Sequence, residues 1–265
     1  MIVFHSDLDN TLIYSYRHDI GEEKIHVEFY EGRKISFMTR RSSLLLKQIQ
    51  ERAVFVPTTT RTEEQYRRID LKTGVLDYAL VCNGGILLRA GRELPEWYEE
   101  SLRLTEKSRG EFACAESCMQ KDSERILEVR NIRNLFLFTK SREPSELARR
   151  LKENLDPERM EVFCHGSKVY AMPKGLDKGT AVRRFKAYIK ADVVFSAGDS
   201  EFDLPMLEEA DYAWAPEELT GRFHCAASVK GIVGDQIFSD AMLEKVLAEV
   251  SDIKYGGCIL HGNIM

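Results

Sequence analysis

Short apolar runs recur along the chain, and stretches with helical spacing lie between them. The apolar runs predict strands at about residues 1–4, 53–57, 78–82 and 192–196. Amphipathic spacing predicts helices at about residues 40–52, 63–69 and 178–190. Ser42 or Ser43 is a candidate N-cap of the first helix, because a serine hydroxyl can accept a hydrogen bond from the first turn. Strands that alternate with helices are typical of a sheet covered on both faces, so we predict an α/β fold with a doubly wound parallel sheet.

Two segments depart from this pattern. Residues 25–39 alternate between apolar and polar side chains with Glu31-Gly32 near their centre, which predicts a hairpin. The hairpin follows a loop that carries two aspartates, and it could cover whatever those aspartates bind. From residue 84 the pattern indicates a strand, a long helix, a strand, a helix and two further strands, which is an inserted α+β module. The tail, residues 255–265, shows no clear period and stays unassigned.

We therefore predict two domains. Residues 1–83 and 174–265 form the α/β core, and residues 84–173 form the inserted α+β domain. The chain has 265 residues, which is long enough to bury a large core in one or two domains.

The overall charge and the apolar content exclude several classes of partner. The formal net charge of −5 at pH 7 gives no bulk attraction to nucleic acid or to acidic lipid. No apolar stretch approaches the ~20 residues that span a bilayer, and the N-terminus lacks the pattern of a signal peptide. We expect a cytoplasmic monomer or homodimer that acts on a small molecule, with no nucleic acid and no membrane partner.

The six cysteines are scattered, and no C-x-x-C pair occurs among them. Cys114 and Cys118 could share a helix face and form a metal site with Cys164 and His165. Reduced thiols in a cytosolic protein are the simpler interpretation, and we adopt it.

Asp7 and Asp9 follow the first apolar run and lie one residue apart. In a doubly wound sheet, ligands bind beyond the carboxyl ends of the strands, where both aspartates would lie. Two close carboxylates repel each other unless a cation or a shared proton is present. Mg²⁺ prefers hard oxygen ligands and often uses one or two carboxylates with phosphate oxygens. The pair indicates a Mg²⁺ site in which one carboxylate can also attack, although a surface loop with two acids explains this segment alone equally well.

Two further segments carry groups that can bind phosphate. The apolar strand AVFVP runs into Thr59, Thr60 and Arg61, whose hydroxyls, amides and guanidinium can donate to phosphate oxygens. The alternative is a threonine-rich strand end with a solvated arginine. In PKGLDKGTA, Lys178 opens a helix, where the macrodipole disfavours a cation. Carboxylates and phosphate would explain that position; the alternatives are a solvated lysine, or Lys174 in the same role.

A fourth segment, VVFSAGDSEFDL, again places acids at the end of an apolar strand, with Asp199 followed four residues later by Asp203. A turn followed by an acid-capped helix is the alternative for this segment alone. Each segment alone has such a structural explanation, but these explanations do not account for the order and placement of all four segments together.

The four segments together resemble the motifs of the haloacid dehalogenase superfamily of phosphohydrolases. The matching motifs are D-x-D-x-T at 7–11, T-x-R at 59–61, G-x-x-K-G at 175–179 and G-D-S-x-x-D at 198–203. The inserted module, which opens with Cys82-Asn83-Gly84-Gly85, resembles the C2-type cap. Within the superfamily, the chain is most similar to the Cof-type group and to the sucrose-phosphate and mannosyl-3-phosphoglycerate phosphatases. The resemblance covers nearly the whole chain and implies a Rossmann-like core with a C2-type cap.

The resemblance also implies an activity and a role for each motif residue. It implies a Mg²⁺-dependent phosphatase that hydrolyses a small phosphorylated metabolite, such as a sugar phosphate, through an aspartyl-phosphate. Asp7 would be the nucleophile, and Asp9, packed beside other acids, would be the general acid and then the base. By the same resemblance, Thr59 would bind the phosphoryl oxygens and Lys178 would neutralise their charge. Mg²⁺ would be held by Asp7, the backbone carbonyl of Asp9 and Asp199, and Asp203 would orient water or Lys178. The substrate would be bound by Arg61, Thr60 and Asn83.

One position departs from the Cof-type pattern, which usually has asparagine before the last aspartate. Here that residue is Phe202, whose ring cannot bind a metal or a metal-bound water. Either the metal site is less well supported, or Ser200 or Glu201 compensates. Two other functions therefore stay open: a phosphomutase of the same superfamily, and a non-enzymatic regulatory protein on a degenerate scaffold.

Overall fold

The computed structural model describes residues 1–234 and 236–259, and the last part of the unassigned tail, 260–265, lies outside the described residues. The chain divides into two compact units. The second unit is Leu94–Asp177, and the first contains the described residues on both sides of it. Each unit contains at least one sheet and a hydrophobic core of its own.

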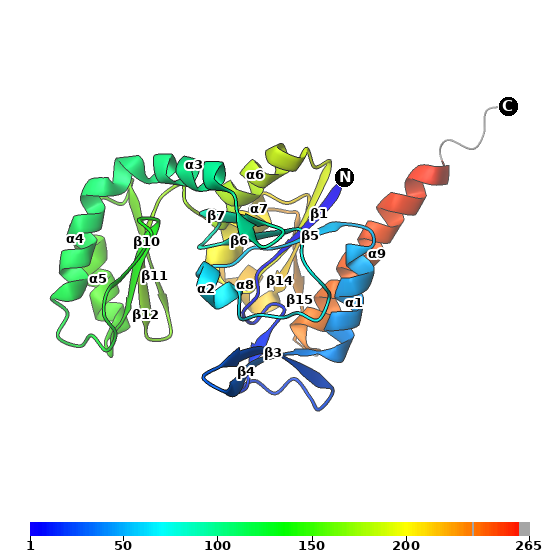
Figure 1. Ribbon diagram of the computed structural model, residues 1–265, viewed down its shortest axis with the longest axis horizontal. Helices are drawn as coiled ribbons and strands as arrows, with labels where there is room; N and C mark the ends of the chain where they lie inside the picture. The colour runs from blue at the N-terminus through cyan, green and yellow to red at the C-terminus, as the bar shows by residue number, and fades with distance from the viewer. Residues whose placement is uncertain (235, 260–265) are drawn as a thin grey trace. The chain divides into compact units, whose positions relative to one another are not determined.

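A five-stranded parallel sheet forms the centre of the first unit (Figure 1). Its strands are, in spatial order, β15 (Val229–Ile232), β14 (Tyr212–Pro216), β13 (Val193–Ala197), β1 (Ile2–Ser6) and β5 (Val54–Pro57). The parallel sheet that the apolar runs predicted is confirmed. The chain leaves β1 for β5 on one side and later continues from β13 on the other side. The carboxyl end of β1 is therefore the switch point at which such sheets bind their ligands.

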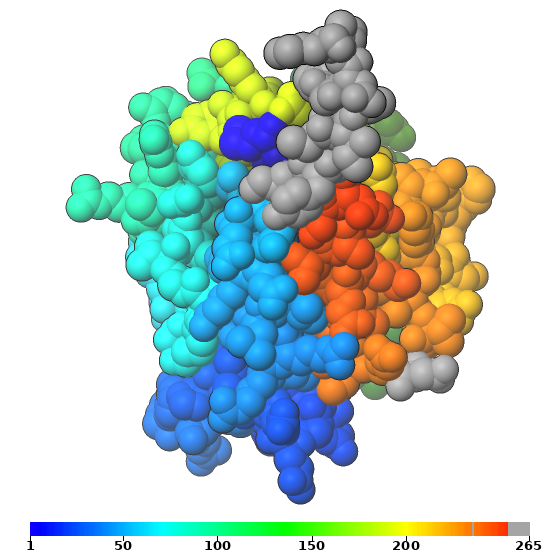
Figure 2. All heavy atoms as spheres, turned by 90° about the vertical axis from the view of Figure 1, so that its right-hand side faces the viewer, coloured from blue at the N-terminus to red at the C-terminus, as the bar shows by residue number. Residues whose placement is uncertain are grey.

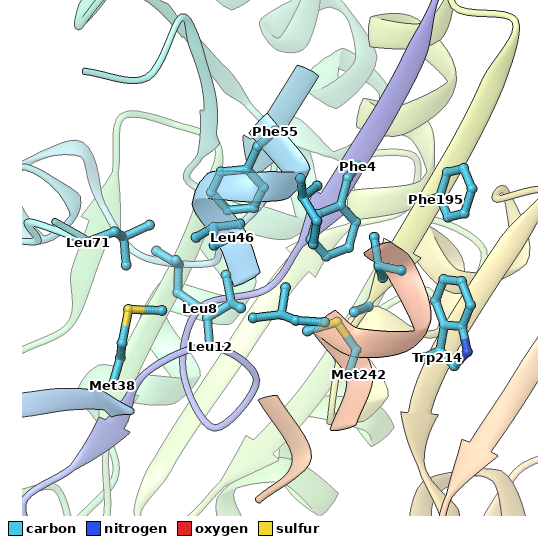
Figure 3. Packing of buried hydrophobic residues seen from close by; sticks show 14 of the residues in the cluster. Phe4, Leu8, Leu12, Met38, Leu46, Phe55, Leu71, Phe195, Trp214 and Met242 are labelled. Carbon is cyan, nitrogen blue, oxygen red and sulfur yellow. The ribbon is translucent and has the colours of Figure 1, made fainter. Parts of the chain in front are cut away.

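Two helices cover one face of this sheet. They are α1 (Arg40–Gln50) and α9 (Phe238–Ile259), which lie side by side (Figure 2). Their apolar side chains form a common cluster with Phe4, Phe195 and Trp214 of the sheet (Figure 3). The rings of Phe195 and Trp214 stack with their centroids 5.9 Å apart. Alternate strand residues point to opposite faces of a sheet, so the remaining strand residues face a second layer of helices.

That second layer consists of α6 (Lys178–Ile189), α7 (Leu204–Glu208) and α8 (Glu217–Arg222). Buried residues from these helices and from the sheet form a separate cluster, which includes Val182, Val194, Leu207, Ala213, Ala215 and Leu219. Helices therefore cover both faces of the sheet, as the sequence predicted. No helix in the described part of the chain is long and apolar enough to cross a membrane.

The start of α1 differs from the prediction that Ser42 or Ser43 caps it. The N-cap is Thr39, whose hydroxyl accepts a hydrogen bond from the backbone of Ser42, 2.8 Å away. Both serines are buried inside the first turn. The hydroxyl of Ser42 lies 2.6 Å from a carboxylate oxygen of Asp240, because α9 packs against this end of α1.

The hairpin predicted at 25–39 is confirmed as β3 (Lys24–Tyr30) and β4 (Arg33–Thr39). A short strand, β2 (Tyr14–Ser15), pairs with β4 and completes a three-stranded sheet. Glu31 and Gly32 both have positive φ, 48° and 74°, which makes the tight turn between the two strands.

The predicted domain boundary at residue 84 is corrected by the pairing of the next strands. Strand β6 (Tyr78–Val81) pairs in antiparallel fashion with β7 (Ile86–Arg89), and β7 pairs with β8 (Arg92–Glu93). This small sheet belongs to the first unit, so the second unit begins at Leu94 rather than 84 and ends at Asp177 rather than 173. The predicted strand 78–82 is therefore present, but it forms a sheet of its own rather than a strand of the central one.

The second unit is an α+β structure, as predicted. Its antiparallel sheet has the order β11 (Met160–His165), β12 (Lys168–Pro173), β10 (Phe136–Lys140) and β9 (Arg130–Ile132). Helices α4 (Arg109–Gln120) and α5 (Pro144–Asn154) contribute to the apolar cluster of this unit. The long helix that the sequence predicts is divided into α3 (Pro95–Thr105) and α4 by a 3₁₀ turn, where the hydroxyl of Ser108 donates to the carbonyl of Arg159.

Candidate active site

The loops that follow β1, β5 and β13 meet at one edge of the central sheet. The backbone N–H of Asp7 donates to the carbonyl of Ala197 at 2.9 Å, and that of Thr58 donates to Ser6 at 2.8 Å. These bonds continue the sheet pairing beyond the strands. They bring the loops that start at Asp7, Thr58 and Gly198 together at the switch point.

Three aspartates gather there. Each of Asp7, Asp199 and Asp203 offers a carboxylate oxygen, and these oxygens lie within 4.8 Å of one another. Asp7 and Asp203 are buried, and Asp199 is half-buried. The hydroxyl of Thr11 donates to Asp199 Oδ1 at 2.8 Å, so the D-x-D-x-T motif contributes its threonine as well.

Lys178 supplies the compensating positive charge. It is the first residue of α6, and its side chain is 1% exposed. Its Nζ atom lies 2.5 Å from both Asp7 Oδ1 and Asp203 Oδ1. Burial disfavours the charged form of Lys178, but the two carboxylates outweigh that effect and raise its pKa. The competing residue Lys174 is exposed and lies in the second unit.

Asp203 orients its neighbours through both carboxylate oxygens. Oδ1 accepts the bond from Lys178, and Oδ2 accepts from the backbone of Asp199 (3.0 Å), the backbone of Ser200 (2.9 Å) and the hydroxyl of Ser200 (2.8 Å). These bonds use most of its acceptor capacity. Asp203 therefore fits a role that positions Lys178 and the Asp199 loop better than a role as a direct metal ligand. The hydroxyl of Ser200 serves that network, beside the half-buried Phe202.

Two of the three aspartates, Asp7 and Asp199, have raised pKa values. Burial raises the pKa of Asp7 well above the usual carboxyl range, and Lys178 offsets only part of that effect. Burial and the neighbouring Asp203 raise the pKa of Asp199 to about 7. A divalent cation between these carboxylates would favour their ionised forms, because its positive charge compensates for the protons that the carboxyl groups lose.

The donor set at this edge fits Mg²⁺. Asp7 and Asp199 provide carboxylate oxygens, and the backbone carbonyl of Asp9 lies in the same loop as Asp7. Mg²⁺ takes hard oxygen ligands of this kind and commonly keeps several waters. Within the described residues, these aspartates are the one cluster with metal-ligand geometry, and the suggested site at Cys114 and Cys118 is not formed. Cys258 lies outside the residues whose side chains are described.

Asp9 lies close enough to Asp7 and Asp199 for its charge to raise their pKa values, as expected of an acid beside other acids. Its carboxylate also forms a two-bond ion pair with Arg61, which the sequence did not predict, with Nε and Nη2 each 2.7 Å from an oxygen. A third nitrogen of Arg61, Nη1, lies 2.9 Å from Glu28 Oε1. Burial disfavours the charge on Arg61, but these two carboxylates raise its pKa. Arg61, predicted as a substrate ligand, therefore contacts Asp9 and Glu28 in this structure.

The other predicted binding residues lie on two connected turns. Thr59 is fully buried, and its hydroxyl accepts a bond from the backbone of Arg61 at 3.1 Å. Thr60 is half-buried in the same turn. The backbone N–H of Asn83 donates to the carbonyl of Thr59 at 2.9 Å, and Cys82 and Asn83 both adopt positive φ. Left-handed non-glycine residues of this kind cluster at functional sites.

Sequence reasoning missed Glu28, and although Gly198 and Ser200 lie in the G-D-S-x-x-D motif, it did not predict their contacts with Asp203. Gly198 allows Asp203 to approach the backbone, since a Cβ atom there would lie 2.3 Å from Asp203 Cβ. Ser200 supports Asp203, and Glu28 lies on the hairpin, outside every motif. The position of Gly198 before the strand-end aspartate was a usable signal, but nothing in the alternation of the hairpin distinguishes Glu28.

Comparisons with known proteins agree with this architecture. Residues 94–218 match the family model of haloacid dehalogenase-like hydrolases. Among curated proteins, none matches the sequence. Among solved structures, the sucrose-phosphatase of Synechocystis has a TM-score of 0.64 and 15% identity, covering 94% of this chain and 98% of that one.

Two further solved structures are similar. A trehalose-6-phosphate phosphatase of Aspergillus fumigatus has a TM-score of 0.51 and 14% identity, covering 95% of this chain and 92% of that one. A haloalkanoate-superfamily phosphatase of Bacteroides thetaiotaomicron has a TM-score of 0.54 and 16% identity, covering 94% of each chain. At these identities, the solved structures show the fold alone.

Proposed function

We propose that this chain is a phosphatase for a small phosphorylated metabolite. Residues 94–218 match the family model of haloacid dehalogenase-like hydrolases, and the fold resembles that of a sucrose-phosphatase. The observation that carries the proposal is the position of Lys178 Nζ, 2.5 Å from both Asp7 and Asp203, with Asp199 in the same cluster. A buried nucleophile, a buried cation and a set of hard oxygen donors meet at the switch point of the sheet. This arrangement suits phosphoryl transfer, which depends on positioning and on stabilisation of charge.

In the first step, a carboxylate oxygen of Asp7 attacks phosphorus while the bond from phosphorus to the alcohol oxygen breaks. Asp9, protonated from solvent before this step, donates that proton to the leaving oxygen, so the alcohol departs neutral. Lys178 neutralises charge on Asp7 and on the phosphoryl group. Thr59 and the turn that contains it donate to the phosphoryl oxygens. The product of this step is a phosphate ester of Asp7.

In the second step, Asp9 removes a proton from water, and the water oxygen attacks phosphorus. The bond between phosphorus and Asp7 breaks, which releases inorganic phosphate and restores the carboxylate. Asp203 keeps Lys178 in place throughout. Mg²⁺ held by Asp7, Asp199 and the Asp9 carbonyl would add positive charge at the phosphoryl oxygens.

We place the substrate among sugar phosphates. The sucrose-phosphatase structure, which resembles this chain along nearly its whole length, contains sucrose and phosphate. The Aspergillus fumigatus neighbour is a trehalose-6-phosphate phosphatase. These neighbours support the class of substrate and do not identify one sugar.

A panel of sugar phosphates, with and without Mg²⁺, tests the function. We expect release of inorganic phosphate from at least one ester when Mg²⁺ is present, and strong inhibition when a chelator removes it. A phosphomutase would convert the ester to an isomer without releasing phosphate. Folded protein that acts on no ester in the panel would contradict the proposal and favour a non-enzymatic role.

A further inference from the structure

Glu28 is a buried carboxylate on the hairpin, outside the four sequence motifs. Its side chain is 1% exposed. Oε1 lies 2.9 Å from Arg61 Nη1 and 3.3 Å from Arg68 Nε, and Oε2 accepts a bond from the hydroxyl of Ser36 at 2.7 Å. A buried carboxylate is costly unless it is paired and hydrogen-bonded in this way.

A bulge in β3 turns Glu28 toward the site. The register with β4 shifts between His26 and Glu28 and again between Glu28 and Phe29. Regular alternation would send Val27 and Glu28 to opposite faces, yet both are almost fully buried. Bulges occur next to active sites, where they redirect a side chain. The local backbone is therefore built to direct this carboxylate inward.

The contacts of Glu28 continue to the proposed acid and base of the reaction. Arg61 binds both oxygens of Asp9 through Nε and Nη2, and Glu28 binds Nη1. The carboxylate of Asp9 is 48% exposed, so local packing alone does not fix its direction. The planar guanidinium has a fixed arrangement of donors, and its two-bond contact sets that direction. Glu28 in turn sets the plane of the guanidinium.

We infer that Glu28 is a positioning residue for the phosphoryl transfer: acting through Arg61, it directs the Asp9 carboxyl group toward the oxygen of the leaving alcohol. This inference rests on the proposed function, and it assigns a catalytic purpose to the hairpin. Loss of the Glu28 charge leaves Arg61 without its second carboxylate partner. The guanidinium then turns, and Asp9 delivers its proton less effectively.

A purely structural role is the competing explanation, because Glu28 also binds Ser36 of the same hairpin and Arg68 of the core. The two explanations differ in one measurable quantity. A misplaced general acid slows the departure of a basic leaving group, which needs a proton, more than that of a group that leaves as a stable anion. A structural defect lowers both rates together.

The experiment compares phenyl phosphate with p-nitrophenyl phosphate, which have similar shapes and different leaving-group basicity. The value of kcat/KM reports the steps up to departure of the alcohol. For Glu28→Gln, we expect kcat/KM for phenyl phosphate to fall about tenfold or more. The value for p-nitrophenyl phosphate should change much less. Glu28→Asp keeps the charge and should recover part of the loss.

Asp122→Asn in the second unit is the matched control. Asp122 is equally buried and binds Arg150 Nη2 at 2.5 Å, but it is not part of the site. The control should leave the ratio of the two kcat/KM values unchanged. An equal loss on both esters in Glu28→Gln, or no loss on either, overturns the inference. If the wild-type chain hydrolyses neither ester nor any sugar phosphate, the proposed function fails. The positioning role is then tested separately by a crystal structure of Glu28→Gln. An unaltered pair of Asp9 and Arg61 in that structure would overturn the positioning role.

Discussion

Gly198 lies directly against Asp203, and a side chain at this position would collide with it. A Cβ atom would approach the Asp203 carboxyl carbon to 2.5 Å, well inside contact distance. Asp203 cannot retreat easily, because its oxygens bind Lys178 and the loop of Asp199. The absence of a side chain at Gly198 therefore allows Asp203 to take the position in which it holds Lys178, the lysine that contacts Asp7.

We predict that Gly198→Ala lowers the turnover of a phosphate ester about 100-fold, because a small displacement of a catalytic group can cost that much. Overpacking should also lower the free energy of unfolding by about 1–3 kcal/mol. Gly221→Ala is the control, since a Cβ atom there meets nothing within 4 Å and the residue lies in α8. Steady-state kinetics and urea unfolding check both variants. Wild-type turnover in Gly198→Ala would show that the close approach has no catalytic role.

At the scale of elements, one carboxylate joins the end of the hairpin to two helices. Asp240 lies in the first turn of α9, and its Oδ1 accepts bonds from Thr39 at 2.5 Å and Ser42 at 2.6 Å. Thr39 is the last residue of β4 and the N-cap of α1. A bond from the backbone of Ser239 to the hydroxyl of Tyr14 lies beside it. The hairpin and the helices therefore share one network of polar contacts.

We predict that Asp240→Ala lowers the free energy of unfolding by about 1–3 kcal/mol, because two hydroxyl groups lose their acceptor. Asp252→Ala is the control on the same helix, where the side chain is exposed, and its effect should stay within about 0.5 kcal/mol. Urea unfolding followed by circular dichroism measures both. Equal effects of the two substitutions would mean that the network does not join these elements.

At the scale of the whole molecule, the buried acids link stability to pH and to Mg²⁺. The pKa of Asp7 is raised well above the carboxyl range by burial, and burial raises that of Asp199 to about 7. The folded chain therefore holds protons that the unfolded chain releases, and stability falls as pH rises from the usual carboxyl range to about 7. His5 acts in the opposite direction, since burial lowers its pKa to about 3 and protonation at low pH favours unfolding.

We predict that Mg²⁺ raises the melting temperature more at pH 8 than at pH 5.5. At pH 8 Asp199, whose pKa is about 7, is ionised and repels the neighbouring carboxylates unless a cation is present, whereas at pH 5.5 a bound proton relieves that repulsion. The His5 contribution largely cancels in the difference measured with and without Mg²⁺ at each pH. Differential scanning calorimetry provides the comparison. A Mg²⁺ effect that is equal at both pH values, or larger at pH 5.5, would contradict the assignment of these carboxylates to the metal.

Sequence alone predicted the parts of this site that lie at strand ends and at a helix start. Asp7 and Asp199 each follow a strongly apolar strand, and parallel strands bring their carboxyl ends to one edge. Lys178 was identifiable because the macrodipole disfavours a cation at a helix start, which indicates carboxylate or phosphate partners. The pairing of Asp9 with Arg61, however, depends on the orientation of two side chains. The inward direction of Glu28 depends on a bulge, and alternation in the sequence does not reveal one.

We propose that Asp7 attacks phosphorus in a site held by Lys178 and Asp199. The release of inorganic phosphate in Mg²⁺, measured for wild-type protein and for Asp7→Asn on the same ester, tests this role. We predict turnover by the wild type and none detectable by a folded Asp7→Asn, because the amide is a poor nucleophile. Phosphate release by Asp7→Asn at the wild-type rate would rule out Asp7 as the nucleophile.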